Sequence, residues 1–402
     1  MGDRELDLIV FGATSFVGQI ITRRLVERAD TDVRWAIAGR NADKLAAVAA
    51  DTGADVDQIV ADAADADAMA ALAGRTRVVA STVGPYALYG SPLVAAVAAA
   101  GTDYCDLAGE PHWMRSMIDA HESTAVASGA RVVHACGFDS IPSDLGVWFT
   151  QRQATERLGT TCSSISLRVH AVKGGASGGT IASGLNVIEQ ARADPELRRV
   201  LSNPYALCPE SMRSGPRQPD VTGPQRDADG QWAAPFVMAA TNTRVVHRTH
   251  ALLGRPWGDD FEYDEAITTG AGIPGALAAT AVTAGTLISG GLAAFGPTRE
   301  LLRKVVPGPG EGPGPQAQES GYFDLRLHGT TAAGDSITTR VTGDRDPGYG
   351  STARMLTEAA LAFLAVDRDR VAGGFLTPAT AFGDLLIERL VSHAGLTFDV
   401  VD

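Results

Sequence analysis

The N-terminal third of the chain alternates short apolar runs with longer segments whose apolar side chains recur every three or four residues. The apolar runs, which we interpret as buried strands, lie at 6–11, 33–38, 58–61, 78–83, 103–107 and 131–135. The helical segments between them include 17–29, 42–50, 91–101 and 111–128. Such alternation predicts an α/β fold with an N-terminal Rossmann-type sheet, doubly wound and parallel.

The pattern changes from about residue 162 onward. SISLRVHAVK alternates apolar and polar residues, as a half-exposed strand does, and 180–192 resembles an amphipathic helix. Later strand patterns lie near 235–239, 260–268, 321–329 and 336–342, and later helical patterns start at about 351 and at 379. These segments predict a second, α+β domain built on a mainly antiparallel sheet.

A chain of 402 residues exceeds one core of usual size, so we expect more than one domain. The predicted Rossmann domain is 1–150, and the α+β substrate domain is 151–345, with long loops at 203–231 and 297–318. Helices in 346–402 lack a sheet of their own and are expected to pack back on the Rossmann domain.

The first strand ends in a turn, GATSFVG, that opens the first helix. One glycine permits the tight turn and the other a close approach of helix and strand, while backbone N–H groups face outward at the helix N-terminus. Such a turn binds a pyrophosphate, although Ser15 stands where a middle glycine is often found. The alternative is an ordinary strand-to-helix turn. The expected phosphate-binding residues are Gly12, Thr14, Ser15, Phe16, Val17 and Gly18.

The end of the second strand favours NADP over NAD. Arg40 follows this strand, and no acidic residue occurs at 38–42, where NAD-binding folds usually place a carboxylate. An arginine there accommodates a 2′-phosphate; the alternative role of Arg40 is to cap the next helix. Asp62, after the third strand, is a candidate for contact with the adenine amino group or for an N-cap.

Two more turns follow the carboxyl ends of predicted strands. Open α/β sheets bind their ligands at this edge. The fourth strand is followed by Gly84-Pro85, and CGFDSIPSDLG at 136–146 follows the sixth strand. The nicotinamide is expected between these two turns. The residues expected near the cofactor on the first turn are Thr82, Val83, Gly84 and Pro85.

The net charge and the cysteine content limit which classes of partner the protein is expected to bind and in which cellular compartment we expect it. The net charge of −13 argues against a nucleic-acid partner, because phosphate-backbone binding rests on an excess of lysine and arginine. The four cysteines lack metal-ligand spacing, and His247 and His250 lack a third ligand, so we expect no metal site. Scattered cysteines and an N-terminus without a secretory signal predict a cytoplasmic protein with reduced, buried thiols.

Residues 266–297 carry no charge and are rich in Ala, Gly and Thr. The stretch is long enough to span a bilayer, but its glycines and threonines contribute little insertion energy. We expect a helix buried in the second domain or at a contact between two copies in a homodimer. The alternative is an exposed apolar surface that meets a lipid-like substrate or a membrane, which would make the protein membrane-associated.

Several motifs together resemble a known family. In chain order they are GATSFVG, AGR, STVGPYALYG, GTDYCDLAGEP, HACGFDSIPSDLG, KGGASGGTIAS, TNTRVVHR, DPGY and LTPA. They resemble the saccharopine dehydrogenase-like oxidoreductases, and most of all the mycobacterial trans-acting enoyl reductases of phthiocerol and phenolphthiocerol lipid synthesis. This resemblance implies an NADP-dependent reductase that acts with a polyketide synthase. Its substrate would be an acyl or polyketide thioester, free or bound to a carrier protein.

Reduction of an α,β-unsaturated thioester requires a hydride at the β-carbon, a polarised carbonyl and a proton for the α-carbon. The cofactor supplies the hydride, so the protein must supply a donor near the nicotinamide. We expect this donor to be Tyr86, with Asp139 and Lys173 as further candidates. The alternative roles are packing over the cofactor for Tyr86, a helix cap for Asp139 and a surface charge for Lys173.

Three functions stay open. The first is an NADPH-dependent enoyl reductase acting in trans. The second is a reductase of a C–N or keto group, as the name of the wider family suggests. The third is a non-catalytic NADP-binding partner of a lipid-synthesis or membrane-surface assembly. The chain has no Tyr-x-x-x-Lys motif, which disfavours the short-chain dehydrogenase mechanism.

Overall fold

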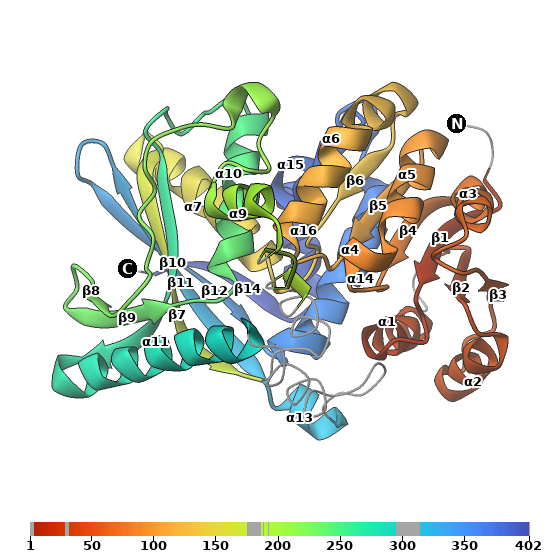
Figure 1. The fold of residues 1–402 in the computed structure, drawn as a ribbon, viewed down its shortest axis with the longest axis horizontal. Helices are drawn as coiled ribbons and strands as arrows, with labels where there is room; N and C mark the ends of the chain where they lie inside the picture. Colours follow the sequence, from red (N-terminus) through yellow and green to blue (C-terminus); the bar gives the residue numbers. More distant parts are fainter. Residues whose placement is uncertain are drawn as a thin grey trace.

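The computed structural model describes residues 4–28, 32–174, 186–187, 189–191, 193–294 and 314–401. Its strands form two seven-stranded sheets, called sheet A and sheet B below. Figure 1 shows sheet A with the N-terminal helices around it and sheet B on the other side of the molecule. The α/β fold with two sheets agrees with the prediction.

Sheet A is parallel throughout, with the strand order β13-β6-β5-β4-β1-β2-β3. Because the chain adds β2 and β3 on one side of β1 and β4 to β6 on the other, the sheet is doubly wound, as predicted. Its strands are Leu6–Phe11 (β1), Trp35–Gly39 (β2), Asp57–Val60 (β3), Thr76–Ser81 (β4), Asp103–Asp106 (β5), Arg131–Val133 (β6) and Gly374–Leu376 (β13).

Helices pack on both faces of sheet A because alternate residues of its strands point to opposite sides. Leu8 and Val10 belong to one buried cluster together with Leu25 of α1, whereas Ile9 belongs to the other together with Leu93 of α5. The N-terminal helices are Phe16–Glu27 (α1), Ala42–Thr52 (α2), Ala66–Arg75 (α3), Tyr86–Tyr89 (α4), Ser91–Ala100 (α5) and Pro111–Ser128 (α6).

Sheet B has the order β14-β12-β11-β7-β10-β9-β8, and all its pairs are antiparallel except β7 with β10. One face packs on α7, where Gly146 lies against Leu327 and Val341. The strands are Cys162–Lys173 (β7), Gln225–Arg226 (β8), Gln231–Pro235 (β9), Glu262–Ala271 (β10), Tyr322–Thr331 (β11), Ser336–Gly343 (β12) and Leu396–Val401 (β14). Ile141–Leu158 (α7) precedes these strands, and the helices between them include Pro195–Ser202 (α9), Glu210–Met212 (η1), Ala239–Leu252 (α10), Gly272–Ala294 (α11) and Pro315–Glu319 (α13).

Four expectations in this part of the chain need correction or cannot be judged. The strand expected near 235–239 lies at Gln231–Pro235, and the long loop expected at 203–231 contains η1 and β8. Most of the helix expected at 180–192, and of the loop expected at 297–318, lies outside the described residues.

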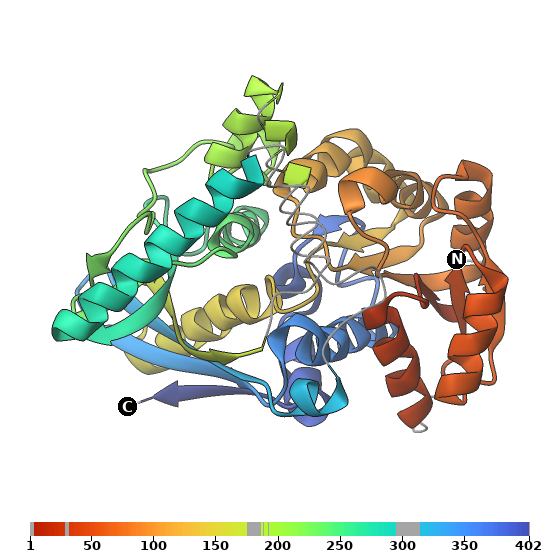
Figure 2. The same ribbon diagram turned by 60° about the horizontal axis from the view of Figure 1, so that its bottom comes forward.

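The C-terminal segment contributes to both halves of the molecule. A turn at Pro347–Ser351 (η2) leads into Thr352–Ala365 (α14), which lies beside α1 (Figure 2) and over β4 and β5. The helix expected at 379–390 is interrupted at Gly383, whose φ is +49°, and forms Pro378–Phe382 (α15) and Asp384–His393 (α16). Two strands were not foreseen: β13 extends sheet A and β14 extends sheet B. The boundaries at 150 and 345 stay predictions.

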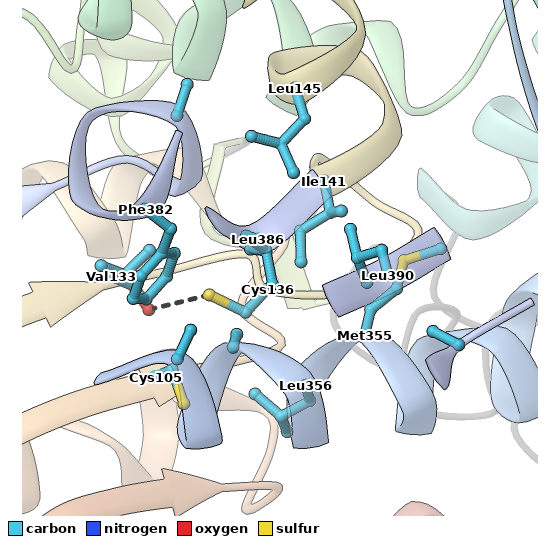
Figure 3. Close-up of a cluster of buried hydrophobic side chains, with 14 of the residues drawn as sticks. Cys105, Val133, Cys136, Ile141, Leu145, Met355, Leu356, Phe382, Leu386 and Leu390 are labelled. Atoms are coloured by element: carbon cyan, nitrogen blue, oxygen red, sulfur yellow. Dashed lines mark hydrogen bonds between the residues drawn. The ribbon is translucent and has the colours of Figure 1, made fainter. Parts of the chain in front are cut away.

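Residues from four distant segments meet in the core between sheet A and α14 (Figure 3). Cys105 and Cys136 lie there beside Leu356, and the thiol of Cys136 donates to the carbonyl of Val133 (3.5 Å). Burial raises the pKa of both thiols well above the usual value. All four cysteines are free and buried, which confirms the prediction that they serve as small apolar residues.

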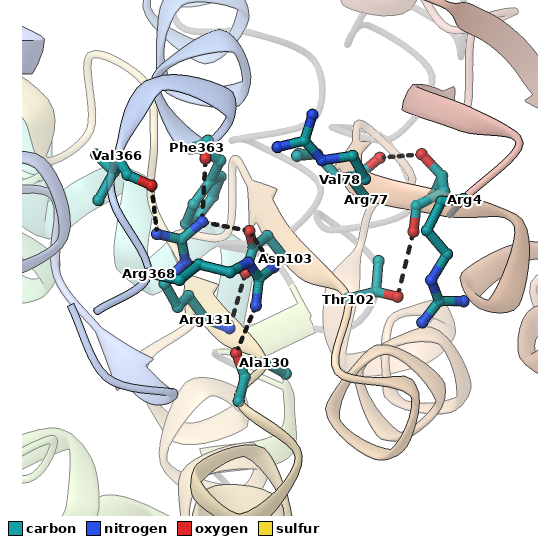
Figure 4. A network of polar contacts seen from close by, with 12 residues as sticks. Arg4, Arg77, Val78, Thr102, Asp103, Ala130, Arg131, Phe363, Val366 and Arg368 are labelled. Carbon is teal, nitrogen blue, oxygen red and sulfur yellow. Dashed lines mark hydrogen bonds and ion pairs between the residues drawn. The ribbon is translucent and has the colours of Figure 1, made fainter. Parts of the chain in front are cut away.

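A buried ion cluster joins the C-terminal segment to sheet A at the edge where β5 and β6 begin (Figure 4). The Asp103 carboxylate accepts hydrogen bonds from the Arg131 guanidinium (2.5 and 3.0 Å) and from Arg368 (2.6 Å). Arg131 also donates to the carbonyl of Phe363 (3.0 Å) at the end of α14. Asp103 and Arg131 are fully buried, so each charge depends on the other for compensation.

The uncharged stretch forms the end of β10 and then α11, which packs along β9 and β10. Complete burial within the second domain is wrong for the described part of α11, because Ile273, Leu277, Leu287 and Ile288 are each more than 60% exposed. The contact between two copies stays a prediction. Among the described residues, no helix combines the length and the hydropathy that a membrane span requires.

Candidate active site

The turn between β1 and α1 has the geometry of a phosphate-binding turn. Gly12 has φ +88°, and a Cβ there would lie 2.7 Å from Val83 Cγ2 and 2.8 Å from Thr82 Oγ1. A Cβ on Gly18 would lie 2.3 Å from the carbonyl oxygen of Gly12. Both positions therefore require glycine, because the turn packs closely against Thr82, Val83 and the start of α1.

Ser15 takes the place of a middle glycine by capping α1. Its hydroxyl accepts the N–H of Gly18 (3.0 Å) and bonds to Thr82 Oγ1 (2.8 Å), and Thr82 in turn donates to the carbonyl of Gly12 (2.9 Å). One detail of the prediction is wrong: the N–H of Ser15 is bonded to the carbonyl of Gly12 (2.9 Å). Within the described chain, the N–H groups of Thr14, Phe16 and Val17 have no acceptor, so these three can receive a pyrophosphate.

Arg40 lies exposed directly after β2. The alternative that it caps α2 is wrong, because the N-cap is Asn41, whose side chain accepts the N–H of Lys44 (2.9 Å). In the described ranges, no hydrogen bond or ion pair occupies the Arg40 guanidinium. It is therefore available to a 2′-phosphate.

Asp62 lies exposed after β3, where its carboxylate accepts the N–H of Ala64 (3.0 Å). The alternative role as an N-cap is also wrong, because Asp65 caps α3 by accepting the N–H groups of Asp67 and Ala68 (both 3.0 Å). The contact of Asp62 with an adenine stays a prediction.

The turn after β4 lies directly against the phosphate-binding turn. Thr82 and Val83 border Gly12, and Gly84-Pro85, a cis peptide, leads into α4. The carboxylate of Glu110, the buried N-cap residue of α6, accepts the N–H groups of Tyr86 (2.7 Å) and Ala87 (3.1 Å). Glu110 thereby joins the turn after β4 to the turn after β5, a role that the sequence analysis did not assign to it.

Tyr86 is brought to this edge, but its hydroxyl is already bonded. It donates to the carbonyl of Ser81 (3.0 Å) and accepts the N–H of Leu107 (3.0 Å), and the ring packs against Trp113. Burial raises the pKa of Tyr86 well above the usual value. These contacts favour a packing role for Tyr86 over proton donation.

Asp139 lies half-buried in the turn between β6 and α7. A Cβ on Gly109, in the turn between β5 and α6, would lie 3.4 Å from the Asp139 carboxylate. Burial raises the pKa of Asp139 to about 6. The N-cap of α7 is Ser140, so Asp139 is not the helix cap. In the part of the chain that the structure describes, no hydrogen bond engages the Asp139 side chain, which leaves it available to a substrate.

Lys173 is exposed at the end of β7, and no hydrogen bond or ion pair in the described ranges joins it to Tyr86 or Asp139. The next residue, Gly174, lies against Asp346 and Pro347.

The DPGY segment is a part of the site that sequence reasoning quoted only as a family motif. The ring of Tyr349 packs edge-on against Phe16 of the phosphate-binding turn, with ring centres 4.8 Å apart. Thr352 accepts the N–H of Phe138 (3.0 Å) and donates to the carbonyl of Pro347 (2.7 Å). The C-terminal segment thus borders both the phosphate-binding turn and the Asp139 turn. Among the described residues, no group of three or more His, Cys, Asp or Glu side chains gathers as a metal site.

Comparisons with known proteins agree with this geometry. Residues 8–133 match the family described as the saccharopine dehydrogenase NADP binding domain. The glycines of the first turn and the unoccupied guanidinium of Arg40 fit this cofactor. The N-terminal part of the chain therefore binds NADP.

The full chain matches curated proteins from mycobacteria. It is 43% identical, over 96% of each chain, to a Mycobacterium tuberculosis protein named provisionally as a trans-acting enoyl reductase. It is 39% identical, again over 96% of each chain, to a protein of the same species named trans-acting enoyl reductase. These matches confirm the resemblance seen in the motifs.

A solved structure shows the same fold at low identity. Apo saccharopine dehydrogenase (L-Glu forming) from Saccharomyces cerevisiae has a TM-score of 0.56 and 13% identity, over 99% of this chain and 100% of that one. This likeness concerns the fold alone. By sequence, the chain belongs to the saccharopine dehydrogenase-like family of NADP-dependent oxidoreductases, together with the mycobacterial trans-acting enoyl reductases.

Proposed function

We propose that this chain is an NADPH-dependent enoyl reductase that acts in trans on a thioester-bound acyl or polyketide intermediate. The observation that carries the proposal is the match, over 96% of both chains, to relatives named trans-acting enoyl reductase. The site supports it with a carboxyl group, Asp139, that is free to exchange a proton at the carboxyl edge of sheet A.

The cofactor would be held by residues of three turns. Backbone N–H groups at the start of α1 would bind the pyrophosphate, and Arg40 the 2′-phosphate. Asp62 would face the adenine, and the turn at 82–85 would border the nicotinamide. When bound, NADPH supplies the hydride that is added to the β-carbon of the substrate.

Asp139 is the proton donor that we propose for this reaction. Hydride addition moves the electron pair of the carbon–carbon double bond to the α-carbon side of the thioester, which then needs one proton. The protonated Asp139 carboxyl would donate its O–H proton to the α-carbon, and the carboxylate would regain a proton from water. A pKa of about 6, raised by burial, keeps a useful fraction of this group protonated near neutral pH.

The test is NADPH oxidation, followed by the loss of absorbance, with three substrates: a 2-enoyl thioester, a 3-ketoacyl thioester, and a 2-keto acid mixed with an amine. We expect turnover of the enoyl thioester, faster when it is presented on a carrier protein. Turnover of only the keto or imine substrate would contradict enoyl reduction and favour the second function. If NADPH binds but is not consumed with any of the three substrates, the result would favour the third function, a non-catalytic NADP-binding partner.

The exposed apolar side chains of α11 indicate a surface that contacts another molecule. We propose that this helix contacts a second copy in a homodimer or a membrane surface, both of which would shield Leu277 and Leu287 from water. Sedimentation equilibrium and flotation with phosphatidylcholine vesicles separate the two. A monomer that does not float would overturn both contacts.

A further inference from the structure

The turn that carries Asp139 is fixed on both sides of this residue. The N–H of Phe138 donates to Thr352 Oγ1 (3.0 Å), and the hydroxyl of Ser140 donates to Asn242 Oδ1 (3.0 Å). Thr352 belongs to the C-terminal segment and Asn242 to the first turn of α10. Two segments that are distant in sequence therefore determine where the backbone of Asp139 lies.

Asn242 is itself held in one orientation. Its amide Nδ2 donates to Glu265 Oε2 (2.9 Å), and Tyr263 donates to the other oxygen of Glu265 (2.7 Å). Burial raises the pKa of Glu265 to about 7, and above that pH the ionised carboxylate can only accept hydrogen bonds. In that state Glu265 keeps the NH₂ group of Asn242 toward itself. The amide oxygen is then left to face Ser140. Ser140, Asn242, Tyr263 and Glu265 are all buried, which makes a break in this chain of bonds costly.

Thr241, the neighbour of Asn242, binds the turn that faces the Asp139 carboxylate. The hydroxyl of Thr241 donates to the carbonyl of Gly109 (3.2 Å), and Gly109 is the residue that lies against the Asp139 carboxylate. Two successive residues of α10 thus bind the turn that contains Asp139 and the turn that faces its carboxylate. This helix belongs to the half of the molecule built on sheet B, so the position of Asp139 depends on contacts from that half.

We propose that Asn242 is a positioning residue for the reduction: through Ser140 it sets the place of Asp139 relative to the substrate, and Thr241 sets the facing turn. This inference rests on the proposed function, because it takes Asp139 as the proton donor. Neither Asn242 nor Thr241 reacts with substrate. Their effect is transmitted only through the backbone turns that they bind.

The first experiment compares kcat, KM and NADPH affinity in single and double variants. Displacing a reacting group by about 1 Å can cost about 100-fold in rate. We expect Asn242→Ala and Ser140→Ala each to lower kcat about 10- to 100-fold, with the Kd for NADPH within twofold. Since both remove the same bond, the double variant should lose no more than the worse single variant. Ser140→Thr, which keeps the hydroxyl, should recover most of the rate.

Thr243→Val is the matched control. Thr243 lies on the same helix, and its hydroxyl donates to the carbonyl of Ala239 (2.7 Å) within α10. This variant should keep the kcat of the unmodified protein. Melting temperatures of all variants show whether the fold is retained. A normal kcat in Asn242→Ala, or losses that multiply in the double variant, would overturn the positioning role.

A second readout does not depend on turnover. The ¹³C resonance of the Asp139 carboxyl, identified by its loss in Asp139→Asn, is titrated in the unmodified protein and in Asn242→Ala. Release of the turn should admit water and move the Asp139 pKa toward its ordinary value by about one unit. An unchanged titration would overturn the inference. If this titration shifts but Asp139→Asn retains full activity, the proposed donor fails while the positioning of the turn stands.

Discussion

Substitution of Gly18 by alanine tests the phosphate-binding turn. A Cβ at this position would lie 2.3 Å from the carbonyl oxygen of Gly12 and 2.7 Å from the Cα of Ala13, whereas real Cβ contacts stay beyond 3.0 Å, so α1 must retreat by at least 0.7 Å. The carbonyl of Gly12 cannot yield easily, because it accepts from both Ser15 and Thr82 (2.9 Å each). Overpacking of this kind costs about 1–3 kcal/mol.

Two measurements follow from this displacement. At about 2–4 °C per kcal/mol, the melting temperature of Gly18→Ala should fall by several degrees. Hydrogen bonds from the helix N-terminus to a charged phosphate contribute about 1.5–3 kcal/mol each, so NADPH should bind about 10- to 100-fold more weakly in titration calorimetry.

The control is Gly74→Ala in α3, where the nearest atom to a new Cβ is 3.9 Å away. Alanine there should raise stability by about 0.5–1 kcal/mol and leave NADPH binding unchanged. The reasoning about the turn is refuted if Gly18→Ala melts and binds NADPH like the unmodified protein.

Three further predictions concern single charged groups. Arg40→Ala should weaken NADPH about 10- to 100-fold and NADH less than twofold in titration calorimetry, with Arg23→Ala on α1 as the control; equal weakening of both cofactors would contradict a 2′-phosphate contact. Asp103→Asn leaves the buried guanidinium of Arg131 without its counter-charge, so the free energy of unfolding measured in urea should fall by about 3–5 kcal/mol. A fall of less than about 1 kcal/mol would show that the ion cluster does not stabilise the fold. Because the pKa of Asp139 is raised to about 6 and the donor acts when protonated, kcat should be flat below that pH and fall about tenfold per pH unit above it. In Asp139→Asn this pH dependence should disappear, and a profile that keeps its shape would exclude Asp139 as the titrating group.

Much of sheet A could be predicted because its strands are buried apolar runs separated by helices of regular period. The strand β13 escaped prediction since its three residues, Gly374–Leu376, are too few to show a pattern. The strand β14 has partial alternation, but nothing local indicates that it pairs with β12 rather than staying with the neighbouring helices. Pairing partners across the molecule are set by tertiary packing.

The cofactor half of the site is local and was therefore visible in the sequence. Gly12, Gly18 and Arg40 act through the turns in which they stand, and the curated family confirms NADP as the cofactor. The individual contacts of these residues with NADP stay predictions.

The chemical half of the site depends on contacts between distant segments. Ser140 and Asn242 are 102 residues apart, and Phe138 and Thr352 are 214 apart, so no spacing rule links them. Tyr86 was placed at the right edge of the sheet, but its hydroxyl is bonded to backbone atoms of the neighbouring turns, which periodicity cannot reveal.

Isotope labelling tests enoyl reduction most directly. The unmodified protein is supplied with a 2-enoyl thioester and NADPH that carries deuterium at C4 of the nicotinamide, in separate reactions for the two faces of the ring, and the product is analysed by mass spectrometry and NMR. The account predicts that one of the two labelled cofactors gives a saturated thioester with one deuterium at the β-carbon and that, in heavy water with unlabelled NADPH, one deuterium enters at the α-carbon. A product without label from both labelled cofactors, or label found only on a carbinol or amine carbon with the corresponding substrates, would contradict it.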